Sequence, residues 1–236
     1  MPIAPCRWAR GKSSCAYCGV AIATDGDHVV ADCLYTNGAR KRLKNVLTVP
    51  ACHSCNELKG TFDASLQHYL LIDVDASRHP EAQQLFDSKL ITAIATDRVR
   101  LVDRFHEGQT VSEFTLSGIL IGDSFGIPID SVPVRVALNY IVKGLHYAVF
   151  GEVKQTNEVA TVIVEREERN RVAKGFFEMG IEGHHLQGDV FTVAWVIGSS
   201  NVYWLFDFYS KVLCLGRSAR SSPLYGPPTP PGLVAP

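Results

Sequence analysis

The sequence predicts an α+β protein in which a small metal-held module precedes a larger region of helices and antiparallel strands. Two Cys-x-x-Cys pairs lie in the first quarter of the chain, within a stretch rich in Cys, Gly, Asn and Asp. Beyond residue 65 long apolar repeats begin, first with helical spacing and later as β-branched and aromatic runs. These observations divide the chain into an arm at 1–12, a module at 13–70, an α+β region at 71–217 and a tail at 218–236.

The composition is that of an ordinary soluble globular protein, with 46% apolar and 20% charged residues in a chain of 236. No apolar run reaches the roughly 18 uncharged residues of a membrane-spanning helix. The basic start of the chain is followed by no apolar segment of the kind that a secretory signal contains. The expected location is therefore the cytoplasm, where cysteine thiols stay reduced.

Three helices are predicted from apolar residues that recur every three or four positions. Ser65 is a candidate cap for a helix through "SLQHYLLI", and a longer periodic run at 79–108 ends at a glycine. The strongest helical pattern follows Ser131, with one apolar face that contains Val134, Leu138, Ile141, Leu145 and Val149. His146 lies in this helix near aromatic residues, and we expect it to pack in the core rather than to stack on a base.

The strands are predicted from β-branched and aromatic runs that are bounded by turn residues. The segment "TVSEFTLSGILIG" is interpreted as one or two strands. The segments "VFTVAWVIG" and "VYWLFDFYSKVLCLG" flank the turn "SSN", which predicts an antiparallel hairpin or meander whose aromatic residues form the sheet core. The tail carries six of the twelve prolines and is expected to be disordered. His184 and His185 are assigned to a surface loop, because no third metal ligand accompanies them.

The two cysteine pairs predict a structural zinc site. Cys15/Cys18 and Cys52/Cys55 are separated by 33 residues, and each pair can offer two thiolates from a tight turn. Four thiolates complete the tetrahedral coordination of Zn²⁺ and leave no open position. A redox Cys-x-x-Cys is the alternative, but it leaves the second pair unexplained. His53 lies inside the second pair and is expected to be a bystander. The other cysteines are expected to be plain thiols: Cys6, Cys33 and Cys214.

Charge is distributed unevenly, although the net charge of the chain is only −1. Residues 1–65 hold eight Lys/Arg against five Asp/Glu, a net charge of +3, and the basic excess is densest in "ARKRLKN". Such a run is most often a solvated loop, and phosphate contact is the alternative. The basic residues of this cluster are Arg40, Lys41, Arg42 and Lys44.

Between and after the cysteine pairs lie polar residues in a recognisable order. Asp27 and His28 are adjacent, Asn45 precedes the second pair and Asn56 follows it directly. With "CAYC", "DH", "NVLTVPACHSCN" and the lysine of "NELKG", residues 13–63 resemble the HNH endonucleases that carry a four-Cys zinc site around a ββα-metal motif. The string "VPACHSCN" also resembles one uncharacterised bacterial subgroup, whose members continue into an α+β C-terminal region.

The resemblance implies a fold and a set of residue roles. The module would be a zinc-clamped ββα-metal unit that hydrolyses phosphodiester bonds in DNA, with RNA as the alternative substrate. His28 would be the general base and Asn45 would orient it. Asp27 and Asn56 would hold one Mg²⁺ or Mn²⁺ through oxygen atoms. Lys59 and the basic cluster of residues 40–44 would contact phosphates. Many relatives have His in place of Asn56 and a proline soon after the Asp-His pair, where this chain has "VVADC".

Two other functions are compatible with the sequence. The module could be a zinc-stabilised nucleic-acid-binding or protein-interaction unit that does not cleave, although the complete set of polar residues favours cleavage. Alternatively, residues 71–217 could carry a scaffold role with the module as an accessory. This region has no chemical motif; its candidate roles are to choose the substrate, to form a homodimer or to sense a signal.

Overall fold

The computed structural model describes residues 11–43, 46–73, 79–90, 107–114, 120–126 and 131–220, and it is a mixed α+β structure, as predicted. Its strands are β1 (Asp25–His28), β2 (Thr48–Ala51), β3 (Gln109–Phe114), β4 (Leu120–Gly126), β5 (Val159–Ile163), β6 (Gly183–Gln187), β7 (Phe191–Ile197), β8 (Asn201–Phe208) and β9 (Val212–Ala219). Its α-helices are α1 (Asn37–Arg42), α2 (His53–Asp73), α3 (Pro80–Leu85), α6 (Ser131–Phe150) and α7 (Arg169–Glu178). None of the described helices is long and apolar enough to cross a membrane.

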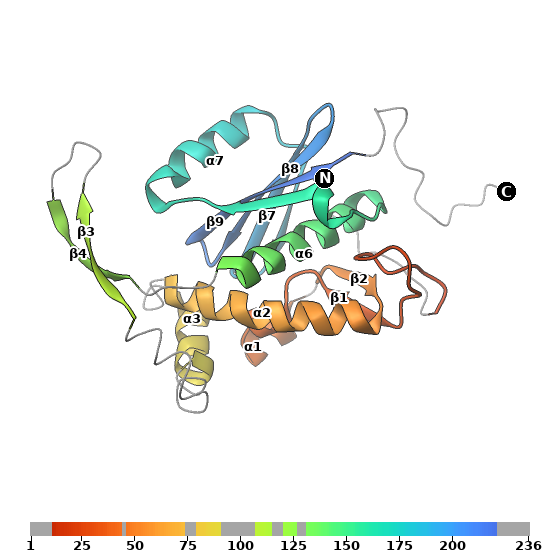
Figure 1. Cartoon of the computed structure of the whole chain (residues 1–236), viewed down its shortest axis with the longest axis horizontal. Coiled ribbons are helices and arrows are strands. Elements are labelled where there is room, and N and C mark those ends of the chain that lie inside the picture. Colours follow the sequence, from red (N-terminus) through yellow and green to blue (C-terminus); the bar gives the residue numbers. More distant parts are fainter. Residues whose placement is uncertain are drawn as a thin grey trace.

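The N-terminal module is a hairpin packed beside a long helix. Strands β1 and β2 pair antiparallel, with Asp27 opposite Val49 and His28 opposite Thr48. Between them lie the 3-10 turn η1 (Asp32–Leu34) and α1. The side chain of Thr36 caps α1 by accepting a hydrogen bond from the Ala39 amide at 3.1 Å. Figure 1 shows the hairpin alongside α2, so the three elements form a ββα unit.

Helix α2 begins twelve residues before the predicted cap at Ser65, so that prediction is wrong. Its first turn starts directly after Cys52, whose carbonyl accepts from the Asn56 amide at 3.0 Å. The early turns "HSCNELKGTFDA" carry few apolar residues, and the periodicity therefore starts late. The helix starts inside the second cysteine pair, and its first turns have no apolar face from which a helix could be predicted.

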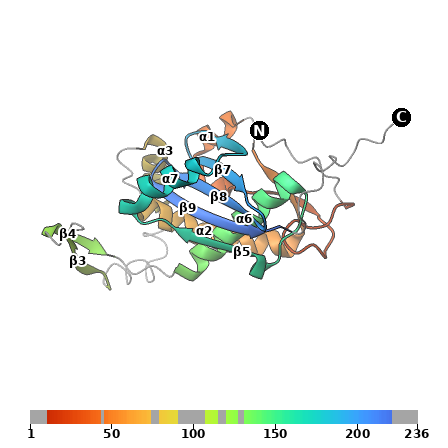
Figure 2. The ribbon, with the colours of Figure 1, turned by 90° about the horizontal axis from the view of Figure 1, so that it is seen from above.

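The C-terminal region is a five-stranded antiparallel sheet in the order β5-β9-β8-β7-β6, with α6 on one face and α7 on the other (Figures 1 and 2). Successive side chains of β7 point to opposite faces of the sheet, so this strand contacts both helices. Val193 and Trp195 belong to the large core with α6, whereas Ala194 and Val196 pack with Phe176 of α7. The predicted meander is confirmed by β7, β8 and β9. Strand β9 reaches Ala219, two residues into the segment assigned to the tail.

Several local predictions can be compared with these elements. Helix α6 begins at Ser131 and buries the predicted apolar face, with Val149 partly buried. The segment "TVSEFTLSGILIG" contributes to the paired strands β3 and β4. The run at 79–108 forms α3 and a π-helical turn at Phe86–Leu90, and residues 91–106 lie outside the described part.

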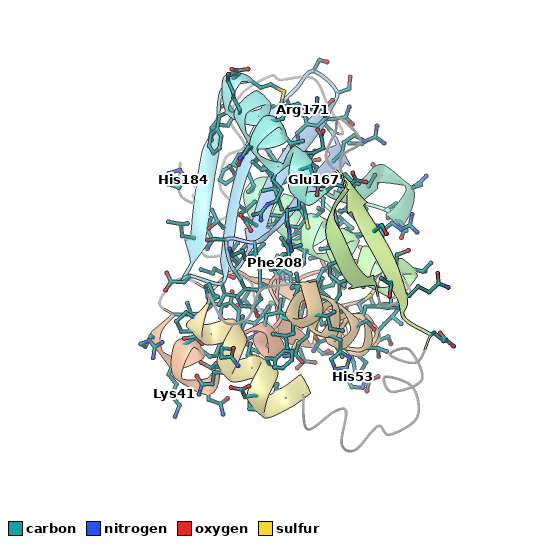
Figure 3. The ribbon with its side chains drawn as sticks, turned by 90° about the vertical axis from the view of Figure 1, so that its left-hand side faces the viewer. Lys41, His53, Glu167, Arg171, His184 and Phe208 are labelled. Carbon is teal, nitrogen blue, oxygen red and sulfur yellow. The ribbon has the colours of Figure 1, made fainter. Side chains whose placement is uncertain are left out.

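The two adjacent histidines are placed differently from the prediction. His184 and His185 lie in edge strand β6, not in a surface loop. His184 is exposed and His185 is buried, because successive side chains of a strand point to opposite faces. Figure 3 shows His184 pointing outward from its strand. Of the three cysteines outside the pairs, Cys214 is buried in β9, Cys33 is partly buried, and Cys6 lies outside the described residues.

One hydrophobic core joins the module to the C-terminal region. It includes Val29 and Val49 of the module together with Leu138 of α6 and Trp204 of β8. Helix α6 lies next to α2 in both views of the ribbon (Figures 1 and 2). The two parts of the chain are therefore packed against each other without an intervening layer of solvent.

Replacement of Gly144 by alanine is expected to weaken this junction. A Cβ at Gly144 of α6 would lie 2.9 Å from Val29 Cγ2, closer than such atoms pack. We expect a loss of about 1–3 kcal/mol in the free energy of unfolding, measured by urea denaturation. The matched control is Gly175→Ala in α7, where a Cβ would meet nothing within 4 Å. That change should stabilise the protein by up to about 1 kcal/mol, and equal effects of the two changes would contradict the packing described.

His146 packs in the core, as predicted. It is 1% exposed, its Nδ1 lies 2.8 Å from Ser218 Oγ, and its ring contacts Phe150 at a centroid distance of 4.8 Å. Burial, reinforced by the Lys154 charge, lowers the pKa of His146 to about 4, and Glu152 and Glu158 oppose this shift. The folded protein thus holds His146 as a neutral ring at pH values where the unfolded chain would protonate it.

The stability of the protein should therefore depend on the titration of His146. Its contribution is fully present above pH about 6.5, the ordinary histidine pKa, and is lost as the pH falls toward the folded pKa. The loss should reach up to about 3 kcal/mol. Urea unfolding of wild type and His146→Gln at pH about 7.5 and 5 would measure it. The decrease between the two pH values should be smaller in the variant, and equal decreases would show that another group is responsible.

Candidate functional site

The four paired cysteines form one cluster. Their Sγ atoms all lie within 4.8 Å of one another, and Cys15 and Cys52 are buried. Four thiolates at about 2.3 Å from a shared Zn²⁺ would be about 3.8 Å apart, so this set fits a structural zinc ion. The exposed His53 lies outside the cluster, 3.3 Å from Glu57. The predicted clustering of these four cysteines is confirmed, and the cluster could hold a structural zinc ion.

Backbone hydrogen bonds hold the first pair in a tight turn against β2. The Cys15 amide donates to Ala21 and the Gly19 amide to Cys15, both at 2.8 Å. Gly19 has a φ of +71°, a left-handed conformation that glycine adopts at little cost. The Ala16 amide donates to the carbonyl of Pro50 in β2, also at 2.8 Å. The turn is thereby fixed beside the strand that leads to the second pair.

His28 lies at the end of β1, between an acidic and a basic side chain. Its Nδ1 is 3.1 Å from Asp32 Oδ2, and its Nε2 is 2.7 Å from Arg40 Nη2. The Nε of Arg40 also donates to Asp32, which closes a triangle of three side chains. Burial lowers the pKa of His28; the Asp32 charge opposes this shift and the Arg40 charge reinforces it. The side chain is 29% exposed, so solvent still reaches the ring.

Asp27 lies beside a buried lysine. Asp27 is 9% exposed, and its Oδ2 accepts a hydrogen bond from the Tyr17 hydroxyl. Lys59 Nζ lies 3.4 Å from the same oxygen, 3.0 Å from the His28 carbonyl and 2.7 Å from Asp63 Oδ2. The ammonium of Lys59 therefore joins α2 to the two adjacent residues of β1.

The position of Lys59 corrects its assignment as a phosphate contact. The residue is 0% exposed, and its ammonium is surrounded by oxygen atoms of the module. A buried charge requires such partners, because an unpaired ammonium would lose its hydration without compensation. Lys59 therefore stabilises β1 from the interior of the module, and its ammonium does not face the surface that a nucleic acid would reach.

The other predicted site residues are distributed around this core. Asn56 is partly buried and lies three residues before Lys59 in α2, a spacing that places both side chains on neighbouring turns of one helix face. That face is directed at β1 through the contacts of Lys59. Asn45 and Lys44 lie outside the described residues. Of the proposed catalytic set, the structure thus describes Asp27, His28 and Asn56.

Two of the described basic side chains in this cluster have acidic partners. Arg40 is paired with Asp32, and Arg42 with Glu81 at 3.1 Å. Lys41 is exposed in the last turn of α1, and Figure 3 shows it at the outer edge of the molecule. Arg42 remains 72% exposed despite its pairing. Lys41 and Arg42 are therefore the described residues of this cluster that can most readily meet a phosphate.

A second, divalent cation would have oxygen donors available in this region. Among the described residues, both partners of the Asp27 carboxylate contact Oδ2, so Oδ1 is the oxygen that could bind a cation. The amide oxygen of Asn56 is a second donor of the kind that Mg²⁺ and Mn²⁺ prefer. These oxygen types suit such an ion, which Lys59 would partly repel from the Oδ2 side.

Three residues of this site were missed by sequence reasoning: Tyr17, Asp32 and Asp63. Asp63 follows Lys59 by four residues in a helix, a spacing that could have indicated the ion pair. Asp32 also follows His28 by four residues, but the chain there is a strand end and a turn, so spacing alone carried no signal. Comparison with known proteins adds no relative to this description: no family model matches the chain, and no curated protein or solved structure matches it.

Proposed function

We propose that this protein is a metal-dependent endonuclease of the HNH type that hydrolyses phosphodiester bonds in DNA. One observation carries the proposal: Lys59 joins α2 to both Asp27 and His28, inside a ββα unit that a four-Cys cluster closes. This contact supports a site in which a base, a carboxylate and the helix face of Asn56 meet. Such a set suits metal-assisted phosphodiester hydrolysis, in which water must be activated and the leaving oxygen stabilised.

The residues of the chain would divide the work of this reaction. His28 takes the proton from the attacking water, because a neutral imidazole is a suitable base near pH 7. Asp27 and Asn56 would hold a Mg²⁺ or Mn²⁺ ion, which neutralises charge on the scissile phosphate and the leaving oxygen when bound. Lys41 and Arg42 would bind backbone phosphates, which positions DNA without reading its sequence. The zinc ion has no part in the chemistry, because four thiolates leave it no open position.

The proposal is tested by cleavage of plasmid DNA, single-stranded DNA and RNA by the full-length, zinc-loaded protein. Mg²⁺ or Mn²⁺ is added or left out; no chelator is used, because a chelator would also remove zinc. We expect cleavage of DNA only when the divalent ion is present. Salt-dependent DNA binding without cleavage under any condition would instead support the non-cleaving binding module. Cleavage of RNA alone would change the substrate but not the chemistry.

A further inference from the structure

The contacts of His28 determine which of its two nitrogens carries the proton. An arginine guanidinium can only donate hydrogen bonds, and an ionised carboxylate can only accept them. Nε2 faces Arg40 Nη2 at 2.7 Å, so Nε2 must accept. Nδ1 lies 3.1 Å from Asp32 Oδ2, and this contact with a carboxylate favours a proton on Nδ1 over a lone pair. A neutral ring satisfies both partners only as the tautomer with its proton on Nδ1.

We propose that Asp32 is the positioning residue of His28, which it holds as the Nδ1–H tautomer with Nε2 as the proton-accepting nitrogen. The tautomer of a histidine is set by the hydrogen bond that its other nitrogen makes. The tautomer assignment depends only on the contacts of the ring. Its catalytic consequence rests on the proposed function, because Nε2 would then be the atom that receives the proton from water.

The backbone around Asp32 is held independently of its side chain. The Asp32 carbonyl accepts from the Tyr35 amide at 3.1 Å, and the Arg40 amide donates to the Thr36 carbonyl at 2.9 Å. The Asp32 side chain is 52% exposed, so its replacement leaves no cavity in the core. A substitution at Asp32 should therefore change the ring of His28 and release the Arg40 side chain, while the backbone of the turn and of α1 remains in place.

Arg40 would occupy Nε2 only until substrate binds. A guanidinium binds phosphate through two parallel hydrogen bonds, which are stronger than its single bond to a neutral imidazole. A phosphodiester at this site would draw Arg40 away from Nε2 and leave that nitrogen open to water. Asp32 would keep the ring oriented during this exchange, because Nδ1 contacts its Oδ2 whereas Arg40 pairs with its Oδ1.

The test is a two-bond ¹⁵N–¹H correlation spectrum of the histidines of the full-length, zinc-loaded protein at pH about 8, where an ordinary histidine is neutral. The signals of His28 are identified by their loss in His28→Gln. We expect Nδ1 to be protonated in wild type and in Asp32→Asn, whose side-chain oxygen still accepts. With Arg40 also replaced, Asp32→Ala should shift His28 toward the Nε2–H form, because Arg40 alone would still require Nε2 to accept. Arg40→Ala is the matched control and should keep the Nδ1–H form.

Cleavage kinetics of the same variants provide the second measurement. Asp32→Ala should lower kcat about ten- to a hundred-fold with little change in KM, the range typical of groups that contact the second ring nitrogen of a functional histidine. Asp32→Asn should recover most of the lost kcat. An Nε2–H ring in wild type, an unchanged tautomer in the double variant Asp32→Ala/Arg40→Ala, or an equal shift in Arg40→Ala alone would overturn the proposal. If wild type cleaves nothing, the proposed nuclease fails, while the spectra still decide whether Asp32 sets the tautomer.

Discussion

Replacement of Cys52 by serine is expected to remove the zinc ion and to unfold the N-terminal module. The cysteine cluster closes a segment of about forty residues, and small units of this size depend on a metal when their own core is small. Structural zinc sites bind with about 10–16 kcal/mol in isolated zinc-finger peptides, and that binding energy is also folding energy. Since Val29 and Val49 of the module share a core with α6 and β8, the C-terminal region should lose stability as well.

The measurement combines zinc content per chain with urea unfolding. Wild type should hold one zinc ion per chain, and Cys52→Ser should hold none and should lose more than about 3 kcal/mol of the free energy of unfolding. Cys33→Ser is the control, because Cys33 lies outside the cluster and is only partly buried. It should keep its zinc and most of its stability. Full zinc content in Cys52→Ser would show that the cluster does not bind the metal as described.

Replacement of His28 by alanine is expected to abolish cleavage while the fold remains intact. A positioned general base typically contributes about 10²–10⁴-fold to the rate, so kcat should fall by at least about 100-fold. The ring is partly exposed at the end of β1, and the contact of Lys59 is made to the backbone carbonyl of His28. The variant can therefore keep the bond between α2 and β1 and lose only the imidazole.

The control for this experiment is His53→Ala in the same module. His53 is exposed, pairs with Glu57 and stands outside the cysteine cluster, so its loss should leave cleavage unchanged. Zinc content and urea unfolding of both variants are measured before the cleavage assay. Retained cleavage in His28→Ala, or equal loss in His53→Ala, would remove His28 from the role of base.

Prediction from the sequence succeeded where structure depends on local pattern. Helix α6 was predicted because its apolar residues recur along one face from Val134 to Val149, about four turns. Strands β7, β8 and β9 were predicted because their β-branched and aromatic runs are bounded by turns. Helix α7, "RNRVAKGFFE", was missed because it is strongly charged and only Phe176 is buried. Strand β6 was missed because its five residues include a glycine and two histidines, which have little preference for strands.

The sequence by itself identified the four cysteines that cluster as a candidate zinc site, because metal coordination needs only the right donor atoms at spacings that tight turns can bring together. It also determined the order of the polar residues on which the proposed nuclease rests. Only the tertiary structure decided that Lys59 points inward to Asp27 and that Asp32 and Arg40 flank His28. The physical reason is that a charged side chain is attracted to any opposite charge within reach. Which partner it meets, and whether water separates them, depends on burial by elements distant in the chain.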